Sequence, residues 1–160
     1  MIREITSDSR LKDSLEIIKD SFITVANELN LNKENCPAHP AFIGFRKLIE
    51  LKEKGVRMFG MFYEDRQVGF VAIEKADDVL YYMEKLAVLR EYRHRGFGKE
   101  LVDFVLDYVK KRGGNKISIG IIDESSVLKD WYKELGFVET GTRQFEHLPF
   151  LVCFMEKNID

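Results

Sequence analysis

The centre of the chain consists of three strand-like runs joined by very short turns. Residues 56–63, 67–74 and 79–89 are rich in β-branched, aromatic and other apolar residues, and the residues between them, 64–66 and 76–78, are mostly charged turn formers. Connections this short join antiparallel neighbours, since a parallel crossover needs about a dozen residues or more. The pattern therefore predicts an antiparallel meander, around which the remaining elements have to pack.

Amphipathic helices and further strands flank the predicted meander on both sides. Before it, the sequence indicates a strand at 2–6, a helix at 9–29 that Ser7 or Asp8 can cap, and a second helix at 42–55. After it, the expected elements are a helix at 99–112, a strand at 116–123, a helix ending near Leu135, and strands at 137–142 and 150–157. The order β-α-α-β-β-β-α-β-α-β-β places the chain in the α/β (α+β) class.

The composition is that of an ordered chain with enough apolar residues for a core. Of the 160 residues, 45% are hydrophobic and only 3 are prolines, and no Pro-, Gly- or Ser-rich stretch divides the sequence, so we expect one domain covering residues 1–160. The formal net charge of −2 produces no overall positive field, which argues against nucleic acid as a partner.

Neither the cysteines nor the N-terminal residues indicate an exported or membrane-bound protein. Cys36 and Cys153 lie far apart and have neither metal-ligand spacing nor the density of a disulfide scaffold, so we expect both to be reduced. The chain has no apolar leader and no uncharged stretch of about 18 residues that could span a bilayer. We therefore expect a cytoplasmic protein without a membrane partner.

The segment at residues 90–99 concentrates positive charge and glycine directly before a predicted helix. It contains four Lys or Arg residues and one acid, although the positive end of the helix macrodipole makes cations unfavourable there. Gly96 and Gly98 allow a tight turn whose N–H groups are unobstructed, which is how a helix N-terminus receives phosphate. The segment predicts a phosphorylated ligand. The alternative is a solvated basic loop in which the glycines only make the turn.

Two common nucleotide-binding motifs do not fit this segment. A Walker A loop needs a hydroxyl residue after its lysine and an earlier glycine, whereas Lys99 is followed by Glu100 and Arg93 stands at the earlier position. The dinucleotide motif G-x-G-x-x-G would need a glycine where Leu101 stands. Nucleotide hydrolysis and the binding of NAD or FAD are therefore not expected.

Residues 93–98 read Arg-His-Arg-Gly-Phe-Gly, and residues 131–137 contain a Trp-Tyr pair followed by Gly-Phe. With these two motifs and the order of its elements, the chain resembles the GNAT superfamily of acyl-CoA-dependent N-acetyltransferases, whose signature is R/Q-x-x-G-x-G/A. The resemblance implies the GNAT fold, a mixed and mostly antiparallel sheet of about seven strands that splays between strands 4 and 5 and is flanked by about four helices.

The resemblance also implies that acetyl-CoA is the acetyl-donor co-substrate. The residues implied to contact it are Leu86, Ala87 and Val88 along the pantetheine arm, and Arg93, His94, Arg95, Gly96, Phe97, Gly98 and Lys99 around the pyrophosphate. Ser125 stands where the family often has an asparagine that contacts the cofactor, and its alternative role is a helix cap. The three histidines show no metal-ligand pattern, so no metal is expected.

Two residues are candidates for proton transfer. The resemblance places Tyr132 where a tyrosine protonates the departing thiolate, and the alternative for it is simple core packing. Glu84 lies on an apolar strand where burial would raise its pKa toward that of a useful base, and the alternative is an ion pair with Lys or Arg. Alternation puts Glu84 on one face with Tyr82, Leu86 and Val88, unless a bulge reverses the order.

The function that the sequence favours is acetyl transfer from acetyl-CoA to a primary amine of a small molecule or a protein, by direct attack in a ternary complex. The alternative is an acyl-CoA-binding sensor module without transferase activity. A nucleic-acid-binding domain that uses the basic segment ranks last, because the segment lacks an extended basic and aromatic surface. Homodimer formation stays open, since only the resemblance suggests it.

Overall fold

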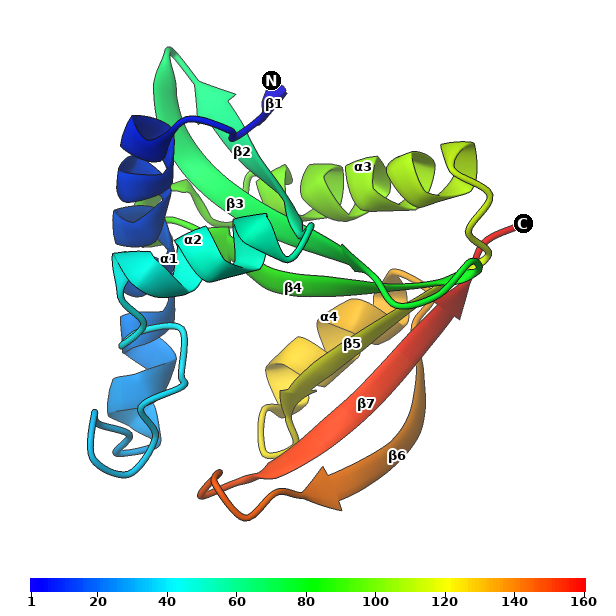
Figure 1. Cartoon of the computed structure of the whole chain (residues 1–160). Coiled ribbons are helices and arrows are strands. Elements are labelled where there is room, and N and C mark those ends of the chain that lie inside the picture. The colour runs from blue at the N-terminus through cyan, green and yellow to red at the C-terminus, as the bar shows by residue number, and fades with distance from the viewer.

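The computed structural model describes residues 1–160 and contains the expected elements in the expected order (Figure 1). Seven strands form one sheet in the order β1-β2-β3-β4-β5-β7-β6. The strands are β1 (Ile2–Glu4), β2 (Arg57–Tyr63), β3 (Arg66–Lys75), β4 (Leu80–Val88), β5 (Lys116–Ile122), β6 (Val138–Gln144) and β7 (Leu151–Asn158). All neighbours are antiparallel except β4 and β5, which confirms the mixed, mostly antiparallel sheet.

Four α-helices cover the two faces of this sheet. The helices α1 (Asp8–Glu28) and α2 (Phe45–Glu53) lie on one face, and α3 (Phe97–Lys111) and α4 (Ser126–Glu134) lie on the other (Figure 1). One apolar core packs α1 and α2 against the meander, and a larger one packs α3 and α4 against the opposite face. None of the helices is both long enough and apolar enough to cross a membrane.

Local sequence explains where the first two helices begin. The Ser7 hydroxyl accepts a hydrogen bond of 3.3 Å from the Arg10 N–H, so Ser7 is the one of the two predicted residues that caps α1. The second helix begins at Phe45, and the prediction that it begins at residue 42 is wrong. Turns occupy the preceding residues, where the N–H of Ala41 donates to Nδ1 of the buried His39.

The strands β4 and β5 stay paired over only a short distance. Their parallel register joins residues 80–82 to residues 116–118, and no pairing follows it. Beyond that point β4 remains paired with β3, and β5 remains paired with β7 as far as Ile122. The two halves of the sheet therefore diverge into the open V seen in Figure 1, which confirms the expected splay.

A β-bulge in β4 reverses the predicted direction of its side chains. Across from β3, Ala87 pairs with Phe70 and Glu84 pairs with Ala72, so β4 contains one extra residue in this interval, and Lys85 has a φ of 53°. Glu84 therefore lies on the α1–α2 face of the sheet with Tyr82, whereas Leu86 and Val88 pack toward the α3–α4 face. The prediction that the four share one face is wrong because of the bulge.

The close approach of the meander strands predicts a stability effect at Gly69. A Cβ at this position would lie 3.0 Å from the Ala87 carbonyl oxygen and 3.2 Å from both Leu101 and Met61. Gly69→Ala should lower the free energy of unfolding by about 1–2 kcal/mol, because crowding of about 1–3 kcal/mol outweighs the entropic gain of replacing glycine. Urea denaturation measures this change.

Gly120→Ala is the matched control, since a Cβ on this β5 residue would make ordinary contacts of 3.4 Å or more. Equal stability of the two variants would show that the meander tolerates the crowding.

Candidate active site

The residues before α3 form a turn whose N–H groups are free. Gly96 occupies the N-cap position with a φ of 85°, a backbone conformation that few residues other than glycine adopt without strain. The N–H groups of residues 94–99 donate no hydrogen bond within the protein. Backbone donors at the positive end of a helix are suited to an anion, so the geometry supports the predicted phosphate contact at residues 95–99.

Arg93, the first residue of the motif, is held by the protein itself. Its Nε donates to the Val88 carbonyl at 3.1 Å, and its Nη2 donates to the Ser21 carbonyl in α1 at 2.7 Å. The guanidinium thereby joins the turn, the end of β4 and α1. A role of this side chain at the pyrophosphate stays a prediction, and what the structure adds is a positioning role.

The other charged side chains of the turn also lie against neighbours. The Arg95 guanidinium lies over the rings of Tyr92, at 5.2 Å, and Tyr63, at 5.9 Å. Lys99 forms an ion pair of 2.7 Å with Asp103 on the next turn of α3. Tyr63 belongs to β2, so sequence reasoning did not associate it with the motif, and only sheet topology brings it here.

The splay leaves the outer edge of β4 open next to this turn. The N–H of Leu89 donates to Val68 on β3, and N–H groups of successive strand residues point to alternate sides. The N–H of Val88 therefore points away from β3, into the gap between β4 and β5. Leu86 and Val88 are half-buried and Ala87 is buried, so the predicted pantetheine contacts line one continuous edge.

Tyr132 lies in the core between α4 and the sheet. Its ring packs edge-on against Trp131, at 4.9 Å, and Phe137, at 5.3 Å, and burial raises the pKa of its hydroxyl. The hydroxyl makes no hydrogen bond, yet Ser21 Oγ is the only fully enclosed side-chain oxygen or nitrogen without a partner. The Tyr132 hydroxyl is therefore not fully enclosed, and its contact with the departing thiolate stays a prediction.

Trp131 connects α4 to the turn before α3. A Cβ on Gly98 would lie 3.1 Å and 3.3 Å from two atoms of the indole ring. The two motifs that lie far apart in the sequence are therefore in direct contact, and Gly98 is small because the indole occupies the adjacent space.

Glu84 lies on the opposite side of the sheet and is part of a charged cluster. Burial and the neighbouring Glu74 raise its pKa, although Lys85 Nζ lies 3.9 Å away and acts in the other direction. The interaction with Glu84 lowers the pKa of Glu74, and an ion pair of 3.0 Å with Lys54 contributes to this shift. The expected alternative, an ion pair of Glu84 with lysine, is thus present, but it does not outweigh burial, and the net effect on the pKa of Glu84 is upward. A role of Glu84 as the base stays a prediction.

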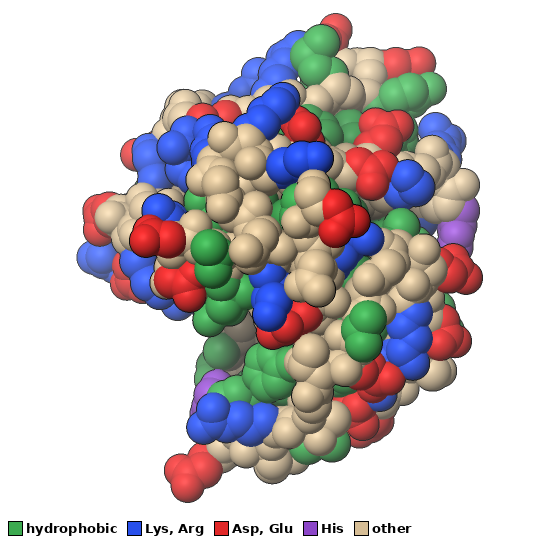
Figure 2. All heavy atoms as spheres, turned by 90° about the vertical axis from the view of Figure 1, so that its right-hand side faces the viewer, with side chains coloured by type: hydrophobic (Ala, Val, Ile, Leu, Met, Phe, Trp, Pro, Cys, Tyr) green, Lys and Arg blue, Asp and Glu red, His purple; other side chains and the backbone are tan.

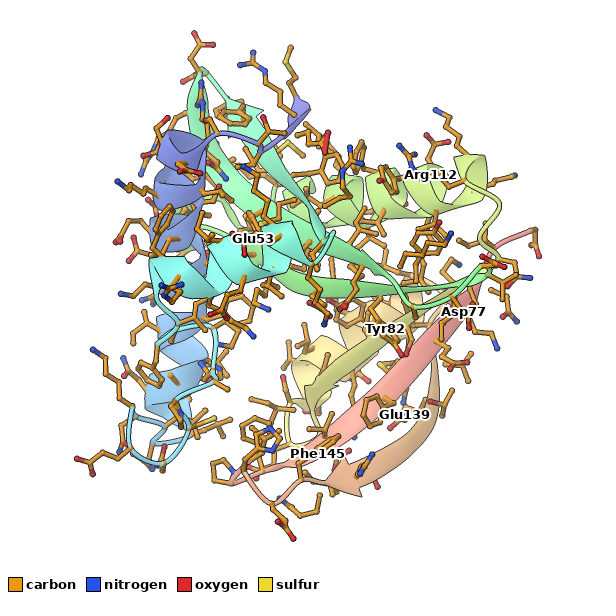
Figure 3. The ribbon with its side chains drawn as sticks, viewed as in Figure 1. Glu53, Asp77, Tyr82, Arg112, Glu139 and Phe145 are labelled. Atoms are coloured by element: carbon orange, nitrogen blue, oxygen red, sulfur yellow. The ribbon has the colours of Figure 1, made fainter.

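A cleft of about 580 Å³ opens beside Glu84 on this face. Its walls come from β4, β5, β6 and β7, and they include Tyr82, Glu84, Gly120, Arg143 and Phe154. Figure 3 shows Tyr82 where β4 begins to separate from β5. The front of Figure 1 lies on the left in Figure 2, and the surface is hollowed on that side. Sequence reasoning did not identify the residues of β6 and β7 that line the cleft, because only the strand order places them opposite Glu84.

Ser125 occupies the N-cap position of α4, but its side chain makes no capping hydrogen bond. Ser125 therefore lies where the helix-cap alternative places it, but its hydroxyl does not make the hydrogen bond that a capping side chain makes. Contact of Ser125 with the cofactor stays a prediction.

The acidic cluster next to α4 is an ion-pair network. Ligand atoms of Asp123, Glu139 and Cys153 lie within 4.8 Å of one another. Lys129 Nζ lies between the two carboxylates, at 2.5 Å from Asp123 and 3.4 Å from Glu139, and Lys133 lies 2.8 Å from Glu139. Burial and Glu139 raise the pKa of the Cys153 thiol. The ammonium groups already balance these carboxylates, so the residues do not fit a metal ion.

Comparison with known proteins gives one consistent result. A model of the acetyltransferase (GNAT) family matches residues 20–137. An uncharacterised N-acetyltransferase of Methanocaldococcus jannaschii is 29% identical over 120 residues, which cover 62% of this chain and about half, 52%, of that protein.

Solved structures agree with the fold. The ribosomal-protein-S18-alanine N-acetyltransferase of Escherichia coli superposes with a TM-score of 0.76 at 16% identity, covering 100% of this chain and 94% of the other. The PaiA N-acetyltransferase of Thermoplasma acidophilum, in complex with coenzyme A, superposes with a TM-score of 0.75 at 17% identity, covering 99% of both chains. These similarities show the same fold.

The contact between Gly98 and Trp131 predicts a coupled effect on coenzyme A affinity. Gly98→Ala should raise the Kd about tenfold, equivalent to about 1.4 kcal/mol, because the methyl group pushes the indole and the turn apart. Adding Trp131→Phe removes the crowding atoms and should restore most of the affinity. Calorimetric titration of both variants, with Trp131→Phe alone as the control, measures this. A double variant as weak as Gly98→Ala would contradict the explanation.

Proposed function

Because this chain belongs to the acetyltransferase (GNAT) family, we propose that it transfers the acetyl group of acetyl-CoA to a primary amine by direct attack in a ternary complex. The acceptor is an amine of a small molecule or a protein, and the name of one structural relative specifies an alanine of a ribosomal protein. The observation that carries the proposal is that β4 has groups suited to the donor on one side and a cleft suited to the acceptor on the other. Free N–H groups and Tyr132 lie toward α3 and α4, and the cleft with Glu84 lies on the other face.

Groups of this chain are available to bind each part of acetyl-CoA. The N–H groups of residues 95–99 would hold the pyrophosphate at the start of α3, and the open edge of β4 would pair with the pantetheine arm. The N–H of Val88 would donate a hydrogen bond to the thioester carbonyl, where negative charge develops as the amine attacks.

The transfer removes two protons from the nitrogen of a protonated amine and gives one proton to the sulfur. A protonated amine cannot attack, so Glu84 would take the first proton from it, directly or through water, in the cleft. The nitrogen then forms a bond to the acetyl carbon while the bond from carbon to sulfur breaks, and it loses its second proton to water. Tyr132, kept protonated by burial, would donate to the departing thiolate.

The proposed role of Tyr132 is tested by Tyr132→Phe, which removes only the hydroxyl. The kcat for acetylation should fall about 100-fold, since a positioned acid contributes on the order of 10²–10⁴. Release of coenzyme A thiol in an amine screen measures turnover, and calorimetry should find the acetyl-CoA Kd nearly unchanged. Unchanged turnover would remove Tyr132 from the mechanism. Binding without turnover for any amine would instead favour an acyl-CoA sensor.

The proposed role of Glu84 predicts a pH dependence of kcat/KM. Glu84 has to be deprotonated to act, so activity should fall as the pH drops through its pKa, which lies above the ordinary 4.5 of glutamate. Glu84→Gln should reduce kcat/KM about 100-fold and abolish this acidic limb.

Glu74→Gln is the matched control, because it removes the neighbouring carboxylate that helps to raise the pKa of Glu84. This variant should stay active and shift the acidic limb to lower pH. An acidic limb that persists in Glu84→Gln would assign the titration to another group.

A further inference from the structure

A second pocket, of about 390 Å³, lies at the carboxyl end of α3. Its lining is contributed by β2, β3, β4, the end of α3 and the turn after α2, through Gly55, Arg57, Ile73, Lys75, Tyr81, Tyr108 and Arg112. It shares no residue with the cleft beside Glu84 or with the turn at residues 93–99. The 15 residues of α3, which correspond to about 22 Å, separate it from that turn. Figure 3 shows Arg112 at this end of the helix. Tyr81 lines this pocket and its neighbour Tyr82 lines the cleft, so the two openings lie on opposite faces of β4.

The charged lining of this pocket is entirely basic. Arg57, Lys75 and Arg112 line it, and no acidic residue does. Glu4, which does not line the pocket, balances Arg57 through two hydrogen bonds of 2.6 Å and 2.8 Å, and its carboxylate also has a weaker electrostatic interaction with Arg112. Lys75 has only the fully exposed Asp78, at 3.6 Å, and exposed pairs of this kind contribute little.

Arg112 is the cation best placed to receive a ligand. It has no acidic partner within ion-pair distance. Its guanidinium stacks on the Tyr108 ring at 3.5 Å from the centroid, and its Nη1 donates to the Tyr108 carbonyl at 3.3 Å. An arginine has five N–H donors, so the group is fixed in place while most of its donors remain unused.

Two tyrosine hydroxyls without a hydrogen-bond partner in the protein belong to the same lining. Tyr81 and Tyr108 are only 4% and 9% exposed, and neither hydroxyl makes a hydrogen bond. Neither hydroxyl is fully enclosed, since Ser21 Oγ is the only enclosed side-chain oxygen or nitrogen without a partner. Because both tyrosines line the pocket, a ligand there can supply an acceptor for these hydroxyls.

We propose that this pocket binds a small phosphate-bearing anion, independently of acetyl-CoA. Three cations and two hydroxyls from different elements surround one space, which suits the tetrahedral arrangement of acceptors on a phosphate better than a planar carboxylate. Ile73 and the tyrosine rings leave room for a small organic group beside it. The negative end of the α3 macrodipole does not attract an anion, so the side chains supply the attraction.

The experiment uses the whole protein saturated with coenzyme A, so that the turn before α3 is already occupied. Inorganic phosphate and phenyl phosphate are titrated in a calorimeter, with benzoate as the carboxylate comparison. We expect saturable binding of one phosphate probe per chain, weakened by added salt, and weaker binding of benzoate. Absence of binding for both phosphate probes, or tighter binding of benzoate, would overturn the proposal.

Variants locate the bound phosphate. Arg112→Gln should weaken phosphate binding at least tenfold, and Tyr81→Phe, which removes only a hydroxyl, should weaken it about threefold. Lys110→Gln is the matched control, because it removes the same charge from the last turn of α3 without touching the pocket. An equal loss in the control, or unchanged binding in Arg112→Gln and Tyr81→Phe, would contradict the site. Thermal melting verifies that each variant is folded.

Discussion

The divergence of β4 from β5 is the constraint on which the rest of the structure depends. Two neighbouring strands that separate inside a sheet leave N–H and C=O groups without ladder partners, and an unpaired buried group costs about 1–3 kcal/mol. The protein satisfies one of these groups itself, since Arg93 donates to the Val88 carbonyl. The N–H of Val88 is left toward the gap without a partner from β5. The opening thus lowers stability and leaves an unpaired strand edge, which is where the proposed pantetheine arm would bind.

The bulge at Lys85 divides the chemistry between the two sides of that opening. An uninterrupted strand would have placed Glu84 and Val88 on one face, and the extra residue sends them to opposite faces. Glu84 then lies in a cleft on the α1–α2 side, where burial and Glu74 raise its pKa. Tyr132 and the free N–H groups lie on the α3–α4 side. In the proposed mechanism, the acetyl donor and the amine acceptor would therefore reach the edge of β4 from opposite faces of the sheet.

The helix α3 connects the remaining features. Its amino end presents free donors to an anion, its middle packs into the larger core, and its carboxyl end holds Arg112 over Tyr108. Trp131 contacts Gly98 and thereby couples α4 to the amino end. At the carboxyl end, the charge comes from side chains that two strands, β2 and β3, and the end of the helix bring together, so the dipole has little part in it.

The sequence by itself determined the order of elements, the turn at Gly96 and the family, because these depend on local propensity and on short motifs. It placed Tyr82 beside Glu84, but it could not determine the face of Leu86 and Val88 relative to them, because one extra residue reverses the alternation of a strand. It also could not identify Arg143 or the pocket around Arg112, since these residues come together only through the order in which strands pair. The tertiary structure decided those points, because burial and charge at a site depend on neighbours that are distant in the chain.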